Sequence, residues 1–504
     1  MRKLILSVWI LSVSVVLYAQ DITLKSSCKE LDAGFEWAKN KARSYVMTGK
    51  SGPVNISERN NKSQEVKYIP SYWAGYPLRT AFYSRDFCHQ AVGAHLLGLA
   101  EENYTMLKAF ASSANASRKW YPVWAINFDG SIYRLDYIDD ANFVREVPAA
   151  FELVEKAYQL YLWTGDKRFY EDETLWTYYT KIVTDFISQH DSIIPNGIAE
   201  GTGEGNIFRG TATYNESKDT PLVEAGDGIA CQYQAMLSYA KMAELRGDKE
   251  TAFVFEEKAA DLKHFFNTKW GVIGTSLYNR GYSSEGNPVE GWGKENSWFM
   301  PLKGLTDPIN QRTVAYLSYI NERLESKDDI PSNIEALSYV PEVFFKYYRN
   351  EEGWKWLKHI LLGINQIHTQ SKLTGTNGDY PEISYVLISN VVENLAGICT
   401  DAGKGSVFSL SHLPKEISSL TVNNILMGKK IFTVSHIKHE LTRFHYIKGD
   451  GSLRWEASFA GTYKYLFVNG VKRECVQRVI DGIRCSICVI SLTPGEIIEV
   501  STTH

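Results

Sequence analysis

Apolar residues recur every three or four positions along most of the chain, which is the period of amphipathic α-helices. The clearest stretch, residues 143–162, ends at Thr164-Gly165-Asp166, and a second helical stretch follows it after this short turn. The same unit of helix, turn and helix recurs further along. The expected helices are residues 35–47, 87–99, 104–113, 143–162, 168–187, 229–245, 251–266, 309–321, 335–348, 354–367 and 383–398.

A self-similar succession of helix pairs predicts a repeat architecture. Roughly a dozen helices in six pairs can close into an (α/α)6 toroid with an inner and an outer ring. We therefore expect a mainly α protein with this toroid over residues 20–404, and an open solenoid is the alternative.

The pattern changes after about Ser406 to short, alternating, β-branched segments separated by the turn signals Asp450-Gly451, Asn469-Gly470 and Pro494-Gly495. We expect a small C-terminal all-β sandwich over residues 405–504. The expected strands are residues 419–425, 430–436, 441–447, 454–458, 463–468, 484–491 and 496–500.

The N-terminus has the three parts of a secretory signal peptide. Arg2 and Lys3 supply positive charge, residues 4–16 are almost wholly apolar, and Leu17-Tyr18-Ala19 fits a cleavage site. We expect residues 1–19 to be removed and the mature protein to be secreted or periplasmic, without a membrane span.

Composition excludes some classes of protein and leaves others open. The 54 basic and 58 acidic residues give a net charge of −4, which provides no general attraction for nucleic acid. Aromatic residues make up 13% of the chain, an excess that can line a sugar-binding cleft as well as fill a core. Seven scattered cysteines do not form a disulfide framework, and Cys485-Ser486-Ile487-Cys488 has no second ligand pair, so neither a metal nor another cofactor is expected.

Acidic residues gather in loops that immediately precede predicted helices. Arg85 and Asp86 open the second helix, with His89 one turn later, and either cap the helix locally or bind sugar hydroxyls. A Gly-rich loop carries Glu200 and Glu204, which we interpret as solvated acids on a rim.

Two further loops of this kind carry the strongest candidates for chemistry. Glu224 and Asp227 lie just before a helix, where Asp227 is also a plausible N-cap. Tyr380 and Glu382 flank Pro381 at the start of the last helix. Trp292, in a similar loop, is a candidate platform on which a sugar ring could stack.

Glycoside hydrolysis requires two carboxyl groups from separate segments at one cleft. One is protonated and assists the leaving oxygen, and the other is ionised and activates water or attacks carbon. The chain contains no Gly-x-Ser-x-Gly elbow, His-Glu-x-x-His pair or dinucleotide fingerprint that would favour another chemistry.

These motifs resemble those of the six-hairpin glycosidase superfamily, which includes glucoamylase-like, trehalase-like and rhamnosidase-like hydrolases. The resemblance rests on Arg85-Asp86, on the Glu-Ala-Gly-Asp stretch at 224–227, and on the Tyr-Pro-Glu-Ile-Ser-Tyr stretch at 380–385 before a β domain. It implies that Arg85 and Asp86 hold a terminal sugar and that Glu224 or Asp227 is the general acid. It also implies that Glu382 is the general base, with Glu393 and Glu342 as alternatives.

The sequence therefore predicts an exo-acting, inverting glycoside hydrolase of an oligo- or polysaccharide. Its catalytic residues are Asp227, Glu382 and, as an alternative acid, Glu224. Its sugar-binding residues are Arg85, Asp86, His89, Trp292 and Tyr380. The rival hypotheses are a polysaccharide lyase that uses Arg209, Tyr214 and His89, an unsaturated-uronide hydrolase, and a glycan-binding protein without catalysis.

Overall fold

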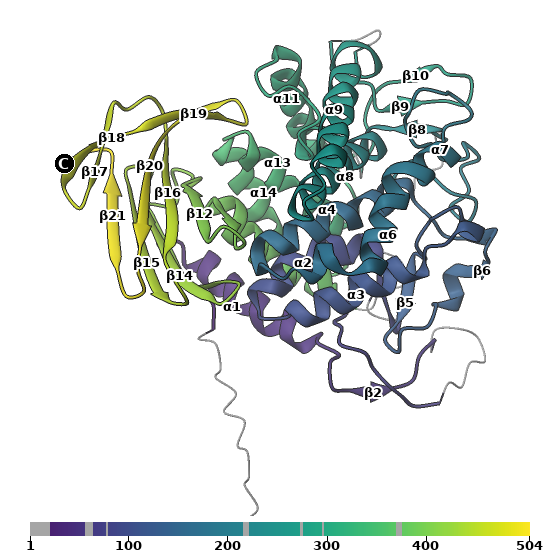
Figure 1. Ribbon diagram of the computed structural model, residues 1–504, viewed down its shortest axis with the longest axis horizontal. Helices are drawn as coiled ribbons and strands as arrows, with labels where there is room; N and C mark the ends of the chain where they lie inside the picture. The colour runs from purple at the N-terminus through teal and green to yellow at the C-terminus, as the bar shows by residue number, and fades with distance from the viewer. Residues whose placement is uncertain are drawn as a thin grey trace, which may run out of the picture.

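The computed structural model describes residues 21–55, 64–76, 79–214, 221–272, 276–294, 297–368 and 375–504. The predicted signal peptide, residues 1–19, lies outside these ranges. Helices make up one side of the molecule and two β-sheets the other (Figure 1).

The predicted helical region consists of helices that agree with the apolar periodicity, with π-helical turns after three of them. The π-helical turns span Ile182–Phe186, Phe266–Trp270 and Asn390–Leu395. The α-helices are α1 (Lys29–Ser44), α2 (Ser84–Leu96), α3 (Ala100–Ser113), α4 (Val147–Thr164), α5 (Arg168–Glu171), α6 (Glu173–Lys181), α7 (Ile187–Gln189), α8 (Gly226–Leu245), α9 (Lys249–Phe265), α10 (Phe299–Leu302), α11 (Gln311–Glu325), α12 (Ile334–Leu337), α13 (Val340–Lys346), α14 (Asn350–Gly363) and α15 (Pro381–Ser389).

The prediction of a helix from residue 143 is wrong by four residues. Phe143 belongs to the short strand β7 (Asn142–Phe143), and α4 begins at Val147 after the extended Glu146. Pro148 in the first turn marks this start, because proline lacks the N–H that a first turn leaves unpaired.

The helices that carry the candidate loops contact one another in succession. Helix α15 contacts α2, α2 contacts α4, α4 contacts α8, α8 contacts α10, and α10 contacts α13. The π-helical turn after α15 contacts α13 in its turn, so the succession returns to its start. The N-terminal turns of α2, α8 and α15 each carry candidate site residues.

Helices α2 and α15 approach especially closely. A Cβ atom added to Gly93 would lie only 2.1 Å from the backbone oxygen of Tyr385. The absence of a side chain at Gly93 therefore allows the two helices to pack closely at this point.

The C-terminal region forms two sheets, as expected. One has the strand order β1-β13-β14-β15-β21-β17-β18 and the other β11-β12-β16-β20-β19. The rings of Phe444 and Trp455, one from each sheet, lie 5.0 Å apart, so the sheets pack face to face. The strands are β1 (Thr23–Ser26), β11 (Ile398–Asp401), β12 (Ser406–Leu410), β13 (Ser419–Met427), β14 (Lys430–Ile437), β15 (Leu441–Lys448), β16 (Leu453–Ala460), β17 (Tyr465–Val468), β18 (Val471–Glu474), β19 (Val476–Ile480), β20 (Ile483–Leu492) and β21 (Ile497–Ser501).

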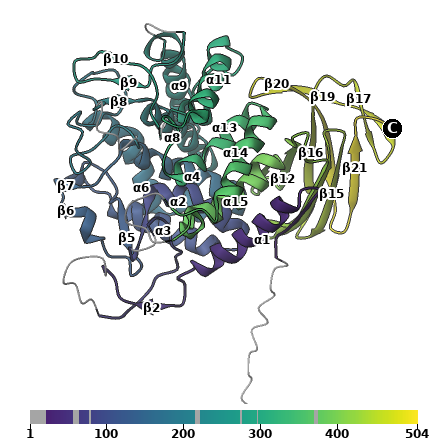
Figure 2. The ribbon, with the colours of Figure 1, turned by 180° about the vertical axis from the view of Figure 1, so that it is seen from behind.

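Two of these strands come from residues expected in the helical region. Strand β1 pairs antiparallel with β13, from Thr23 opposite Asn423 to Ser26 opposite Leu420. Strand β11 pairs with β12. The chain thus enters the β region before α1 and again after α15, as Figure 2 shows from behind.

Short strands near the loops complete the helical side. They are β2 (Ser51–Gly52), β3 (Val66–Lys67), β4 (Ala81–Tyr83), β5 (Ala125–Asn127), β6 (Tyr137–Asp139), β7 (Asn142–Phe143), β8 (Glu224–Ala225), β9 (Gly281–Tyr282) and β10 (Pro288–Val289).

Cys485 and Cys488 both lie in strand β20, and all seven cysteines are free thiols. Within the described ranges, no cluster of three potential metal ligands occurs. None of the helices there is long and apolar enough to cross a bilayer.

Candidate active site

The N-terminal parts of α2 and α15, including the N-cap residue Tyr380, meet through two pairs of side chains. Asp86 and His89 lie three residues apart on α2 and so share one face of the helix. The hydroxyl of Tyr380 donates to Asp86 Oδ1 at 3.0 Å, and His89 Nδ1 lies 2.5 Å from Glu382 Oε1. Four predicted site residues from distant parts of the sequence are therefore in direct contact.

The His89 imidazole lies between two carboxylates. Its Nε2 is 3.6 Å from Glu342 Oε1, on the side opposite Glu382, and its ring stacks on Tyr339 with an angle of 4° between the planes. Burial disfavours the imidazolium, but the two acids outweigh burial and raise the pKa of His89 above its ordinary value.

Burial raises the pKa of two carboxyl groups in this contact. That of Glu382 rises to about 7, although the bond and charge of His89 oppose the change. That of Asp86 also rises with burial, against the opposing charge of Arg85 and the bond from Tyr380. Both groups can therefore carry a proton closer to neutral pH than an exposed acid.

Arg85 extends the contact toward α4 and the loop before α8. Its Nη1 lies 3.6 Å from Glu146 Oε1 and donates to the backbone oxygen of Tyr214 at 3.5 Å. The guanidinium also lies over the ring of Tyr214, 5.4 Å from its centroid.

Asp227 reaches this network through the peptide of Tyr214. It is fully buried at the first turn of α8, where its Oδ2 accepts from the Tyr214 N–H at 2.7 Å and from the Thr213 hydroxyl at 2.9 Å. Burial raises the pKa of Asp227 to about 6, although these donors favour the ionised form. Tyr214 thus contacts Asp227 through its N–H and Arg85 through its carbonyl.

Glu224 is only three residues from Asp227 but has different partners. Its oxygens accept from Trp270 Nε1 at 2.5 Å and from Asn196 Nδ2 at 2.7 Å. Burial raises the pKa of Glu224 to about 7, and the charges of Glu200 and Asp191 add to the effect. Of the two alternatives for the acid, Asp227 is the one that the structure connects to Arg85.

Trp292 also has partners away from this network. Its indole N–H donates to the backbone oxygen of Asp329 at 2.8 Å, and its ring packs against Trp298 and Tyr319. Within the described ranges, no contact joins it to Asp86, Glu382 or Asp227.

Other predictions have mixed outcomes. The interpretation of Glu200 as solvated is wrong, because its carboxylate is buried under a turn and accepts the N–H groups of Ser192 and Ile193. Glu204 is exposed, as expected. Glu393, an alternative base, is half-buried and accepts from Trp163 Nε1 at 2.9 Å and Gln159 Nε2 at 3.1 Å.

The sequence analysis missed several residues of the network. Glu146 precedes Val147-Pro148, and this start of a helix is the kind of position at which the other acids were identified. Glu152 accepts from Tyr214 and from Lys303 Nζ, at 2.8 and 2.6 Å. No local pattern marks Glu152, because Lys303 is distant in sequence.

No family model and no curated protein matches the chain. Solved structures do match. An α-L-rhamnosidase from Dictyoglumus thermophilum aligns with a TM-score of 0.61 and 14% identity, over 95% of this chain and 50% of that one. A Streptomyces avermitilis α-L-rhamnosidase complexed with L-rhamnose aligns with a TM-score of 0.61 and 12% identity, over 95% of this chain and 42% of that one.

A putative kojibiose phosphorylase from the human microbiome aligns with a TM-score of 0.54 and 8% identity, over 94% of this chain and 64% of that one. The chain spans about half the length or less of the two rhamnosidases. These neighbours belong to the six-hairpin glycosidase superfamily, so the predicted resemblance is confirmed for the fold.

Proposed function

We propose that the protein is a secreted or periplasmic glycoside hydrolase that removes a terminal sugar from an oligo- or polysaccharide with inversion of configuration. Its helices would form an (α/α)6 toroid, in keeping with their closed succession of contacts. The neighbouring glycosidase structures support this class of reaction, and α-L-rhamnosides are the first substrates to test.

The observation that carries the proposal is the pair of buried carboxyl groups of Asp227 and Glu382. Asp227 contacts Arg85 through the peptide of Tyr214, and Glu382 contacts His89, one helical turn after Arg85 on α2. The charge of Arg85 also acts on Glu382. Asp227 would donate its proton to the leaving oxygen. Glu382 would take a proton from the attacking water on the opposite face of the sugar, at the separation of roughly 6.5–9.5 Å that inverting enzymes use.

Four side chains would hold the terminal sugar beside this pair. Arg85 and Tyr380 can donate to hydroxyls, Asp86 can accept from them, and His89 also fixes the orientation of Glu382. Imidazolium character at His89 would favour the ionised Glu382 that a general base requires.

The rival lyase mechanism needs a neutralising arginine and a tyrosine or histidine base. The candidate histidine, His89, lies 2.5 Å from Glu382 and 3.6 Å from Glu342. The Tyr214 hydroxyl is buried and donates to Glu152, and burial raises its pKa well above the ordinary value. These contacts favour the hydrolase.

The test is hydrolysis of a panel of aryl glycosides, with anomer-resolved product analysis, by Asp227→Asn and Glu382→Gln variants. We expect each variant to lose about 10²- to 10⁴-fold in kcat, the range for loss of a general acid or base. Fluoride leaves a glycosyl fluoride without being protonated. This substrate should therefore restore activity to Asp227→Asn and not to Glu382→Gln.

Glu244→Gln, an exposed acid on α8, serves as the matched control and should keep full activity. Near-normal turnover by both site variants would contradict the assignment. If Glu224→Gln lost activity while Asp227→Asn kept normal activity, the general acid would be Glu224. Release of an unsaturated product would establish a lyase, and consumption of one would establish an unsaturated-uronide hydrolase.

A further inference from the structure

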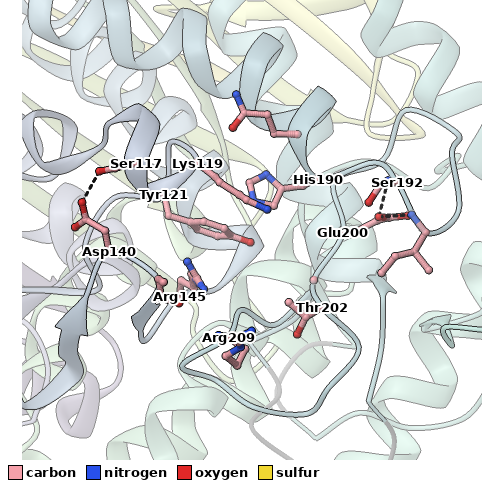
Figure 3. Close-up of a pocket in the computed structure, with 14 residues that line it drawn as sticks. Ser117, Lys119, Tyr121, Asp140, Arg145, His190, Ser192, Glu200, Thr202 and Arg209 are labelled. Carbon is pink, nitrogen blue, oxygen red and sulfur yellow. Dashed lines mark hydrogen bonds between the residues drawn. The ribbon is translucent and has the colours of Figure 1, made fainter.

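A pocket of about 330 Å³ is lined by Arg145, the residue that directly precedes Glu146. Figure 3 shows Lys119, Arg145 and Arg209 around the ring of Tyr121 in this pocket. Arg145 directly precedes Glu146 in an extended segment, so the two side chains point to opposite faces. Glu146 faces Arg85 and Arg145 faces the pocket.

The three cations have little compensating charge. Within the described ranges, neither Lys119 nor Arg145 forms an ion pair, although the charge of Asp139 acts on Arg145. Arg209 lies 3.7 Å from Glu204, which is exposed. Arg145 packs on the rings of Phe143 and Tyr121, and its buried Nε has no partner among the described residues. Burial and the neighbouring charge of Arg209 lower the pKa of Arg145.

The two acids that line the pocket, Asp140 and Glu200, form hydrogen bonds with groups other than the three cations. Asp140 accepts from Arg118 Nε at 2.8 Å and from Ser117, and Glu200 accepts backbone N–H groups of the turn at Ser192. Neither acid has a hydrogen bond or ion pair with Lys119, Arg145 or Arg209 among the described contacts. The pocket therefore presents an excess of positive charge to a ligand.

His190, beside Tyr121 in this pocket, provides a neutral hydrogen-bond acceptor. His190 packs edge-on against Tyr121, and its Nδ1 donates to the backbone oxygen of Phe186 at 2.7 Å. Burial lowers the pKa of His190 to about 4, with a contribution from Lys119 and Arg145. The ring is thus neutral at neutral pH and leaves Nε2 as an acceptor for a hydroxyl group.

We propose that Lys119, Arg145 and Arg209 bind the carboxylate or sulfate group of an acidic sugar, with Tyr121 and His190 contacting its ring. The volume lies at the lower end of the range for small-molecule sites and fits one sugar residue rather than a chain. The inference rests on the proposed function only in taking a glycan as the carrier of the anion.

The experiment is calorimetric binding of free monosaccharides to the full chain. Free monosaccharides contain no glycosidic bond between sugars, so the result does not depend on hydrolysis. D-Glucuronate and D-glucose 6-sulfate are compared with D-glucose. We expect at least one anionic sugar to bind about tenfold or more tightly than glucose, because hydrogen bonds to charged groups are the stronger ones. The sugar that binds distinguishes carboxylate from sulfate.

Lys119 and Arg209 are exposed, so Lys119→Gln/Arg209→Gln should fold normally and bind the anionic sugar about tenfold more weakly. Arg145→Lys keeps the charge but loses the planar fork, and should weaken binding by a smaller factor. The control Arg443→Gln removes an exposed arginine from strand β15 and should not change binding.

Added anionic sugar should also raise the pKa of His190, followed by NMR, because an anion cancels the field of the cations. Equal binding of glucose and both anions, or unchanged binding in the double variant, would overturn the proposal. Equal affinity for inorganic sulfate and the sulfated sugar would also overturn it, since the ring would then contribute nothing.

Discussion

At the scale of single residues, burial determines the chemistry of the candidate site. Asp227 and Glu382 are ordinary acids in the sequence, and removal from water raises the pKa of each toward neutrality. Their hydrogen-bond partners act in the opposite direction and keep both groups able to ionise. In the proposed division of roles, Asp227 donates a proton and Glu382 accepts one. Because the pKa of Glu382 lies above that of Asp227, only a minor fraction of molecules carries both groups in the required state at any pH.

This division predicts a bell-shaped pH dependence of kcat/KM with its maximum between pH 6 and 7. As pH falls through this range, Glu382 gains a proton and can no longer activate water. As pH rises through it, Asp227 loses the proton that the leaving group needs. The measurement is kcat/KM on an aryl glycoside from pH 4 to 9.

In Asp227→Asn, assayed on a glycosyl fluoride, the decline at alkaline pH should disappear, because no acid is left to deprotonate. A flat profile in the wild type between pH 5 and 8 would contradict both pKa assignments.

A second prediction at this scale concerns the buried charge cluster of Lys303, Glu152 and Glu155. Lys303 Nζ lies 2.6 Å from both Glu152 and Glu155, and it is nearly inaccessible to solvent. Lys303→Met leaves Glu152 buried without its cation, so we expect the free energy of unfolding to fall by about 3–5 kcal/mol. Thermal unfolding measures this change.

The matched control is Lys355→Met, which breaks an exposed pair with Glu325 and should cost about 1 kcal/mol or less. Equal melting temperatures for the two variants would show that the buried cluster contributes no more than an exposed pair.

At the scale of elements, the site depends on how closely helix starts approach one another. Asp86 and His89 lie in the first two turns of α2, and Tyr380 and Glu382 lie at the N-cap and in the first turn of α15, so the contact of the two helices puts these residues in pairs. The contact requires a glycine at position 93.

Gly93→Ala should therefore lower both stability and activity. The new Cβ would overlap the Tyr385 carbonyl at 2.1 Å, and backbone cannot yield as a flexible side chain can. We expect a loss of about 1–3 kcal/mol from overpacking, together with reduced kcat, because the two helix starts must move apart.

Melting temperature and turnover should fall together. Glu257→Ala, at an exposed position of α9, is the control and should stay within about 0.5 kcal/mol of wild type. Full activity in Gly93→Ala would show that the site tolerates separation of the helices.

At the scale of the whole molecule, β1 and β21, the first and last strands of the described residues, belong to the same sheet. Strand β1 pairs with β13, and Asp21, just before it, accepts from Lys39 Nζ at 3.2 Å on α1. The N-terminal segment therefore joins the helical and β regions.

Removal of residues 21–26, compared with a chain that starts at residue 21, should lower the melting temperature by several degrees. The loss comprises the β1–β13 ladder, at about 1 kcal/mol for each hydrogen bond, and Asp21, one of the two acidic partners of the buried Lys39. Removal of Thr503 and His504, at the exposed C-terminal end, is the control. If neither deletion changed the melting temperature, β1 would not join the helical and β regions.

The sequence alone predicted most of the elements and a mainly α fold with a C-terminal β region. Periodicity predicted most helices, and alternation predicted seven of the C-terminal strands, but not β12, β18 or β19. Each of the three turn signals falls between two strands, and Asn469-Gly470 closes the β17–β18 hairpin. Local patterns succeed here because amphipathic faces and turn conformations depend on neighbours a few residues away.

The sequence also identified the acids at helix starts, but only the tertiary structure gave each of them its partners. Glu224 and Asp227 are equivalent in the motif, yet one faces Trp270 and the other faces the Tyr214 peptide. Glu200 looked solvated and is buried, while Glu152 gave no signal and is part of the network. Burial and charge pairing depend on segments hundreds of residues apart, so the periodic pattern of any one segment cannot contain them.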